Sequence, residues 1–461
     1  MTVNRRSFLR RSACAGGALL APSLAGLISC GVSRSGGKDT TSRYARKDEG
    51  SYGPLLPSRD VGGLISIPAG FHAALLSTSG DPMIDGVVPN GFDGMAAFAA
   101  GAGRVRLVRN HEVRDPPGAG SRPFGNHPYD TFGPGGTTTV EVLLRPDGAA
   151  EVVKQFASLS GTSVNCAGGS TPWGSWISCE ETVAGTSEGW TRNHGYTFEV
   201  AAAADGAVTA QPLRAMGRFE HEAVAVDPGT GWVYQTEDRK PGGFYRFKPE
   251  HFGRLARGGS LEALAISGQP GHLTGTGQTV LTPRKVEWVS IDTPDSDAPT
   301  LPSGFVFNQG LEKGAAQFAR LEGCWYADES IYFNATAGGN AGAGQVWQYH
   351  IARQELQLIF ESPSPRVLNS PDNICVSPRG GIILCEDGAG TNYVRGLTRE
   401  GAVFDLVRNN ISAIEWAGAC FSPQGRTLFV NIQGNTHPLE NPNLDKGMTF
   451  GIWGPWESGG L

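Results

Sequence analysis

A two-segment unit that recurs six times constrains the fold of this chain more than any other feature. Each unit has a short apolar segment that begins on polar residues, a turn at Gly or Pro, and a second segment that ends on polar, usually acidic, residues. The plainest copies run over 220–238, 372–387 and 415–431, and looser copies run over 93–112, 168–181 and 322–334. Because neighbouring antiparallel strands run in opposite directions, each unit brings both of its polar ends to one edge. Six such hairpins around an axis would turn that edge into a ring of carboxylates.

The spacing of the units predicts the fold class. The second segments end near residues 112, 181, 238, 336, 387 and 433. A period of roughly 40 to 50 residues, lengthened by insertions, is typical of a β-propeller. Short β-branched and aromatic runs, with 66 Gly and 30 Pro in the chain, favour strands and turns. We predict an all-β fold, a six-bladed β-propeller over 55–461 with loop and short-helix insertions; a β-sandwich or a pair of barrels is the alternative.

The longest insertion is expected at about 250–320. Its segment 260–265 (SLEALA) suggests a short helix, and 292–304 (DTPDSDAPTLPSG) has the composition of a polar loop.

The first 30 residues have the pattern of an export signal. Residues 4–10 (NRRSFLR) resemble the twin-arginine signal, and the Gly- and Ala-rich stretch that follows is too short to hold as a membrane span. Residues 27–31 (LISCG) resemble a lipobox, so lipidation of Cys30 and ordinary signal-peptide cleavage are both open. We expect a polar tether over 31–54 and export by the twin-arginine machinery to the periplasm or cell envelope. A lipid on Cys30 would be the only contact with the membrane.

Charge excludes one class of partner. The formal net charge is −6, and no Lys/Arg cluster follows the leader, so nucleic-acid binding has no electrostatic basis. We expect a monomer.

Six cysteines remain after the leader, and most lie in apolar strand segments, which is typical of buried free thiols. Cys179 differs because it directly precedes Glu180 and Glu181 at the polar end of its segment. A thiolate among carboxylates calls for a cation, and soft sulfur favours a transition metal over calcium.

The acidic hairpin ends predict a metal site. Crowded carboxylates raise one another's pKa unless cations compensate, although acids at strand ends also serve as ordinary turn residues. The candidate metal ligands are Cys179, Glu180, Glu112, Glu220, Glu222, Asp238, Glu322, Asp372, Asn373, Glu386, Asp387 and Glu415. Arg239 and Lys240, just beyond Asp238, are candidate phosphate contacts, with surface solvation as the alternative.

Longer motifs resemble a known family. The segments GGSTPWGSWISCEET, GRFEHEAVAVDP, SPDNICVSPRGG with CEDG, and EWAGACFSPQGRTLFVNIQ are similar to those of the PhoX family of bacterial alkaline phosphatases. The resemblance implies a propeller with Fe³⁺ and Ca²⁺ at its axis that hydrolyses small phosphate monoesters outside the cytoplasm. It implies catalytic roles for Cys179, Glu180 and Glu222, and metal contacts for Glu386, Asp387 and Glu415.

Two other functions stay open on the sequence. One is a non-catalytic, calcium-stabilised envelope propeller that binds a ligand or partner. The other is a phytase-like or lactonase-like hydrolase. A serine nucleophile is not indicated, because the GxSxG pattern at 185–189 is not followed by a helix-forming segment.

Overall fold

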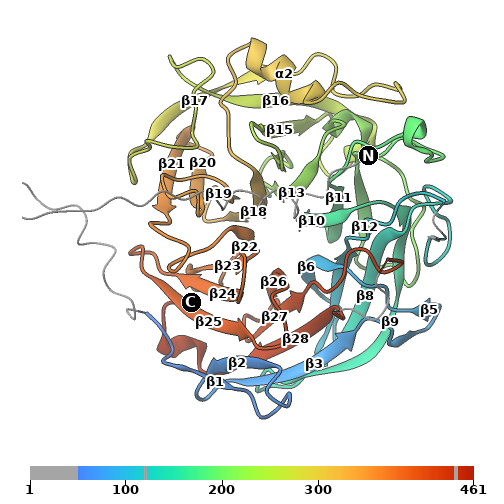
Figure 1. Cartoon of the computed structure of the whole chain (residues 1–461), viewed down its shortest axis with the longest axis vertical. Helices are drawn as coiled ribbons and strands as arrows, with labels where there is room; N and C mark the ends of the chain where they lie inside the picture. Colours follow the sequence, from blue (N-terminus) through green and yellow to red (C-terminus); the bar gives the residue numbers. More distant parts are fainter. Residues whose placement is uncertain (1–49, 119, 121, 441–444) are drawn as a thin grey trace, which may run out of the picture. The chain divides into compact units, whose positions relative to one another are not determined.

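Six antiparallel strand pairs form the inner part of the fold (Figure 1). The computed structural model describes residues 50–118, 120, 122–440 and 445–461. The innermost strands contact one another in a closed ring, in the order β6, β10, β13, β18, β22, β26 and back to β6. The six pairs are β6 (Phe92–Ala99) with β7 (Arg104–His111), β10 (Asn165–Ser170) with β11 (Ser175–Glu180), β13 (His221–Val226) with β14 (Val233–Glu237), β18 (Leu321–Ala327) with β19 (Ser330–Ala335), β22 (Pro371–Val376) with β23 (Ile382–Glu386), and β26 (Trp416–Phe421) with β27 (Thr427–Ile432).

Further strands extend each pair outwards from the ring. They are β8 (Gly135–Leu144), β9 (Ala150–Thr162), β12 (Thr197–Ala201), β15 (Phe244–Pro249), β16 (Gly259–Ile266), β17 (Arg284–Ser290), β20 (Gln345–His350), β21 (Glu355–Glu361), β24 (Tyr393–Leu397), β25 (Val403–Asn409) and β28 (Met448–Trp453). β17 also pairs with β21, which merges two groups into one nine-stranded sheet. We interpret each inner pair with its outer strands as one blade.

The N-terminal strands of the described chain complete sheets that its C-terminal strands begin. β3 (His72–Thr78) pairs with β28, and β2 (Ile65–Pro68), which pairs with β1 (Leu55–Pro57), adds to β25. The Tyr52 hydroxyl lies 2.9 Å from the Trp456 carbonyl oxygen and accepts a hydrogen bond from the Leu461 amide. Tyr52 therefore belongs to the fold, which begins earlier than the predicted boundary at residue 55. A small hairpin, β4 (Pro82–Met83) and β5 (Gly86–Val87), follows β3.

The structure confirms the predicted all-β fold and the predicted positions at which the second strand of each hairpin ends. The second strands end at residues 111, 180, 237, 335, 386 and 432, each one residue before its predicted position. In every pair the first strand's opening residues lie opposite the second strand's last residues, as in the His221↔Glu237 and Pro371↔Glu386 pairings.

The helix predicted at 260–265 is wrong. This segment lies in β16, which pairs with β15 and β17. Leu261 and Ala263 pack into one apolar cluster and Leu264 into another, so burial of both faces of the strand outweighs the helical propensity. The α-helix of the insertion is α2 (Phe305–Glu312), beside β16 (Figure 1). The polar loop 292–304 contains no helix or strand. Single 3-10 turns occur at Thr186–Glu188, Arg214–Met216, Leu255–Arg257 and Trp456–Ser458.

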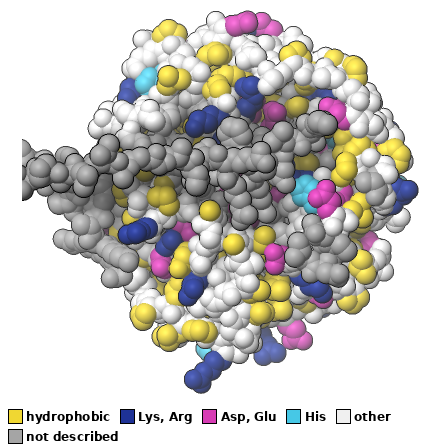
Figure 2. Space-filling model, viewed as in Figure 1, with side chains coloured by type: hydrophobic (Ala, Val, Ile, Leu, Met, Phe, Trp, Pro, Cys, Tyr) yellow, Lys and Arg dark blue, Asp and Glu magenta, His cyan; other side chains and the backbone are white. Residues whose placement is uncertain are grey.

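The predicted leader, Cys30 and residues 31–49 of the predicted tether lie outside the described residues. In the described part of the chain, no helix is long and apolar enough to cross a bilayer. Charged side chains of both signs are dispersed over the face seen in Figure 2. The six cysteines after the leader are buried free thiols, which confirms the prediction for those in apolar strand segments.

Candidate metal centre

Each inner hairpin contains a β-bulge near its open end. In five of them the register shifts directly after the first paired residue, as between Phe92 and Met95, and in β26 it shifts one residue later, between Ala417 and Cys420. At each bulge two residues of the innermost strand lie opposite a single residue of its partner, an arrangement that bends the strand and redirects its side chains. The first bulged residues of the six hairpins, in chain order, are Asp93, Cys166, Glu222, Glu322, Asp372 and Gly418.

Glycines next to these positions let the innermost strands approach closely. A Cβ atom at Gly94 would lie 2.6 Å from the Cα of Ala167, and one at Gly323 would lie 2.6 Å from the backbone nitrogen of Ile374. Such distances leave no room for a side chain. The close approach brings the bulged acids of different hairpins towards the axis.

Seven carboxylates meet in three overlapping groups, in each of which one oxygen per residue lies within 4.8 Å of the others. The groups are Asp93, Glu112 and Glu415; Glu222, Glu322 and Asp372; and Asp372, Asp387 and Glu415. Glu181 and Asp238 adjoin them through shared arginine contacts. We call these nine residues the axial carboxylate cluster. It contains Glu112, Glu222, Asp238, Glu322, Asp372, Asp387 and Glu415 of the predicted ligands, together with Glu181, an acid of the predicted polar hairpin ends, and Asp93.

Burial and mutual repulsion dominate the electrostatics of the cluster. Burial, followed by the charge of Glu322, raises the pKa of Glu222 well above its ordinary value. Burial raises the pKa of Glu181 to about 8, and burial with the charge of Asp387 raises that of Asp372 to about 7. The pKa values of Asp93 and Glu415 are raised for the same reasons. The folded chain thus resists ionising these groups unless cations are present.

Two arginines contact the cluster. The Arg114 guanidinium contacts Glu112 and Glu181, and Arg320 lies 2.8 Å from both Asp238 and Glu322. Their side chains are 37% and 38% exposed, so each guanidinium is partly accessible to solvent. Two cations cannot balance nine carboxylates, and this excess of buried negative charge fits the binding of multivalent metal ions.

Cys166, rather than Cys179, is the thiol beside the cluster. Burial and then the charges of Glu222, Glu181 and Asp93 raise its pKa well above the ordinary value. Both thiols pack in one apolar cluster and neither belongs to the three carboxylate groups, but Cys179 lies opposite the bulge. Burial and then the charge of Glu180 raise the pKa of Cys179, and no carboxylate of the cluster contributes to it. This geometry does not favour the predicted ligand and catalytic roles of Cys179, because its strand position faces the core.

Glu180 is occupied by structural hydrogen bonds instead of facing the cluster. It accepts hydrogen bonds from the backbone amides of Ser163, Gly195 and Tyr196, at 2.9–3.1 Å. Its Oε1 lies 2.6 Å from Nδ1 of the buried His194, whose Nε2 lies 3.5 Å from Asp130. The geometry assigns Glu180 to a buried carboxylate–imidazole–carboxylate bridge rather than to the predicted metal and catalytic roles.

Other predicted residues also lie in structural positions. Glu386 is bound by Arg395 at 2.8 Å and by two backbone amides, because it is the last residue of β23 and turns away from the cluster. The Asn373 amide donates to Asp372 at 2.7 Å and its oxygen accepts from Gly418, so Asn373 holds a cluster residue in place. Glu220 is half-buried and belongs to none of the three groups.

The predicted phosphate contacts lie beside the insertion. Arg239 donates to the Ser303 hydroxyl and to the Pro241 carbonyl oxygen, and Lys240 is exposed. The structure brings Arg114 and Arg320 to the cluster instead.

A closed ring of β-hairpins with buried carboxylates at one end of its axis defines the class, a β-propeller-like protein with a candidate metal centre. The chain belongs to the family described as alkaline phosphatase PhoX, whose sequence pattern matches residues 50–436. Membership makes the chain an alkaline phosphatase, an enzyme that hydrolyses phosphate monoesters. No curated protein matches it in sequence.

One solved structure supports the fold. Pseudomonas fluorescens PhoX in complex with vanadate, a transition-state analogue, matches with a TM-score of 0.65 and 17% identity, over 88% of this chain and 98% of that one. XC5397 from Xanthomonas campestris, a gluconolactonase, matches with a TM-score of 0.45 and 13% identity, over 87% and 98%. At these identities the likeness to solved structures concerns the fold alone.

Proposed function

We propose that the axial carboxylate cluster and the Cys166 thiol hold Fe³⁺ and Ca²⁺, and that phosphate monoesters are hydrolysed at this centre. The observation that carries the proposal is the gathering of nine carboxylates, five buried, three half-buried and one (Asp387) exposed, with two guanidinium groups in contact with them among the described residues. Carboxylate oxygens suit calcium and ferric iron, whereas a thiolate suits iron better than calcium. The donor set therefore fits a mixed centre, with iron on the Cys166 side.

Bound metal ions would supply positive charge to stabilise the transferring phosphoryl group. The chain's own residues contribute binding and orientation. Arg114 and Arg320 are fixed by cluster carboxylates yet remain partly exposed, so they can donate hydrogen bonds to phosphate oxygens. Asn373 restrains Asp372 and so limits the freedom of one cluster carboxylate.

We further propose that the substrates are small phosphate esters and that the enzyme acts as a monomer outside the cytoplasmic membrane. The twin-arginine pattern at residues 4–10 supports this location, and the lipobox at Cys30 supports a lipid anchor.

Two matched cysteine variants test the centre. Cys166→Ser should lower the iron content of the purified protein and remove its thiolate-to-iron absorption band, because the soft ligand is lost. Cys179→Ser alters a buried thiol on the neighbouring strand and should change neither. Elemental analysis and absorption spectroscopy measure both effects, and hydrolysis of an aryl phosphate follows activity.

Chelation provides the second arm of the test. The proposal predicts that removal of the metals abolishes phosphate-ester hydrolysis and that readdition restores it. Full activity in metal-free protein would overturn the proposal. A preparation that contains calcium without iron, together with no activity, would instead favour the calcium-stabilised binding protein.

A further inference from the structure

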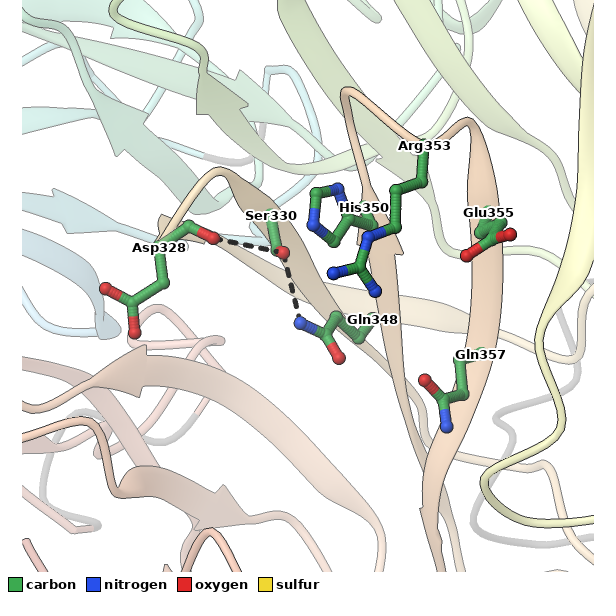
Figure 3. Close-up of a pocket in the computed structure, with 7 residues that line it drawn as sticks. All are labelled: Asp328, Ser330, Gln348, His350, Arg353, Glu355 and Gln357. Carbon is green, nitrogen blue, oxygen red and sulfur yellow. Dashed lines mark hydrogen bonds between the residues drawn. The ribbon is translucent and has the colours of Figure 1, made fainter.

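A polar pocket of about 250 Å³ lies at the turn end of the β18–β21 blade (Figure 3). It is lined by Asp328, Ser330, Gln348, His350, Arg353, Glu355 and Gln357. The turns β18–β19 and β20–β21 form its rim, whereas the axial carboxylate cluster lies at the open ends of the inner hairpins. The pocket is therefore separate from the candidate metal centre.

The strand register gathers the lining residues on one face. Ser330, His350 and Glu355 pair across three strands, and Gln348 pairs with Gln357 one step further along. Since side chains two positions apart on a strand share a face, these rows present their polar groups together. Figure 3 shows the Arg353 guanidinium on the same side as His350 and Gln348.

Three of the lining side chains have unused hydrogen-bonding capacity. The His350 imidazole, the Arg353 guanidinium and the Gln357 amide make no hydrogen bond or ion pair with any side chain or backbone group in the described residues. The Nδ1 atom of His350 is buried and unpartnered. This atom is shielded from solvent, so a ligand in the pocket would meet the other ring nitrogen, Nε2, together with the Arg353 guanidinium and the Gln357 amide.

The charges of the pocket favour an anion. Asp328 is paired with Arg399 at 3.3 Å and Glu355 with Lys285 at 3.1 Å, so both acids are already compensated. Arg353 is the only Lys or Arg among the lining residues, and its guanidinium has no ion-pair partner in the described part of the chain. Its backbone is held in place, because its carbonyl oxygen accepts a hydrogen bond from Lys285 at 3.1 Å.

We propose that this pocket binds a small hydroxylated anion of the size of one sugar ring, with a carboxylate or phosphate as its acidic group. Arg353 and His350 donate to the acidic group. The Gln357 amide and the free carbonyl oxygen of Gln348, whose nitrogen donates to Ser330 and Tyr332, bind hydroxyl groups. The volume corresponds to about eight water molecules, which suits one ring rather than an oligosaccharide.

Calorimetric titration of the full chain tests this site. The metal ions of the protein are first removed by chelation, so that a phosphorylated sugar is neither hydrolysed nor bound at the axial carboxylate cluster. The probes are glucuronate, glucose 6-phosphate, glucose and inorganic phosphate. We expect one site for glucuronate, glucose 6-phosphate or both, with a dissociation constant on the order of 1 mM or below. Whichever of the two binds more tightly identifies the acidic group. Glucose and inorganic phosphate should each bind more weakly, because each lacks half of the contacts.

Variants locate the binding. Arg353→Gln should weaken it at least about tenfold, since a hydrogen bond to a charged group is lost. Gln357→Ala should weaken it less, and Arg366→Gln, a change of an exposed arginine outside the pocket, should leave it unchanged. Thermal unfolding checks that the variants are folded. Absence of binding by both acidic sugars, equal binding of glucose, or unchanged affinity in Arg353→Gln would each overturn the proposal.

Discussion

The buried bridge of Glu180, His194 and Asp130 makes a pH-dependent contribution to stability that can be measured. His194 is fully buried, and both of its ring nitrogens face carboxylates. Burial lowers the pKa of His194, but Glu180 and Asp130 outweigh burial and raise it to about 9. The folded protein therefore holds the imidazolium form, while the unfolded chain titrates near the ordinary value of about 6.5.

The sign and the size of the effect follow from this difference. A histidine whose pKa is raised on folding stabilises fully below about pH 6.5, and the contribution is lost as the pH rises through about 9. The rise of the His194 pKa from about 6.5 to about 9 corresponds to about 3 kcal/mol in the free energy of unfolding. His194→Gln should be less stable than the unchanged protein at pH 6, with a difference that shrinks by about that amount by pH 10.

Urea unfolding at several pH values, on preparations with equal metal content, measures the difference. His251→Gln, a change of an exposed histidine, is the control and should show no such trend. If the difference between His194→Gln and the unchanged protein stays constant or grows with pH, the bridge does not hold a proton and the reasoning fails.

Two further predictions concern the cluster and its glycines. Metal-free protein should lose stability as the pH rises from about 4.5 to about 8, because the raised pKa of Glu181 makes the folded state bind a proton that the unfolded chain releases. Thermal unfolding at several pH values measures this dependence, which should be weaker once metal is restored. An equal pH dependence with and without metal would contradict the prediction. Gly323→Ala should lower the free energy of unfolding by about 1–3 kcal/mol, because the new Cβ would lie 2.6 Å from the backbone nitrogen of Ile374. Gly206→Ala is the control and should change the free energy little, because no atom lies near the position of its Cβ. Similar losses in both variants would refute the steric argument.

The sequence predicted the hairpin edge well because period-2 strands and turn residues are local signals. It therefore identified cluster residues such as Glu112, Glu222 and Asp387, which lie at strand ends. It could not distinguish Glu180 from Glu181, because adjacent strand-end residues point in opposite directions and only the observed register decides between them. Arg114 and Arg320 were missed because their contacts depend on how loops from different hairpins meet.

The difference between the predicted position of Cys179 and the observed position of Cys166 has a more specific physical cause. Five of the six first bulged residues are followed directly by Gly or Ala, as in Asp93-Gly94, Cys166-Ala167 and Glu322-Gly323; the exception is Asp372-Asn373. The small residue is needed where the neighbouring innermost strand approaches, as the 2.6 Å distance at Gly94 shows. Cys179 is followed by Glu180, which such a position would not accommodate.

An acid or Cys followed directly by Gly or Ala is thus the sequence pattern that indicates the axial position, and of the two cysteines Cys166 and Cys179 only Cys166 has it. The same alignment makes the donor set asymmetric. The first bulged position supplies a carboxylate in four hairpins, with Asp93, Glu222, Glu322 and Asp372, a thiol in the second and Gly418 in the last. A single sulfur among oxygen donors favours a softer metal ion beside Cys166 than elsewhere in the centre.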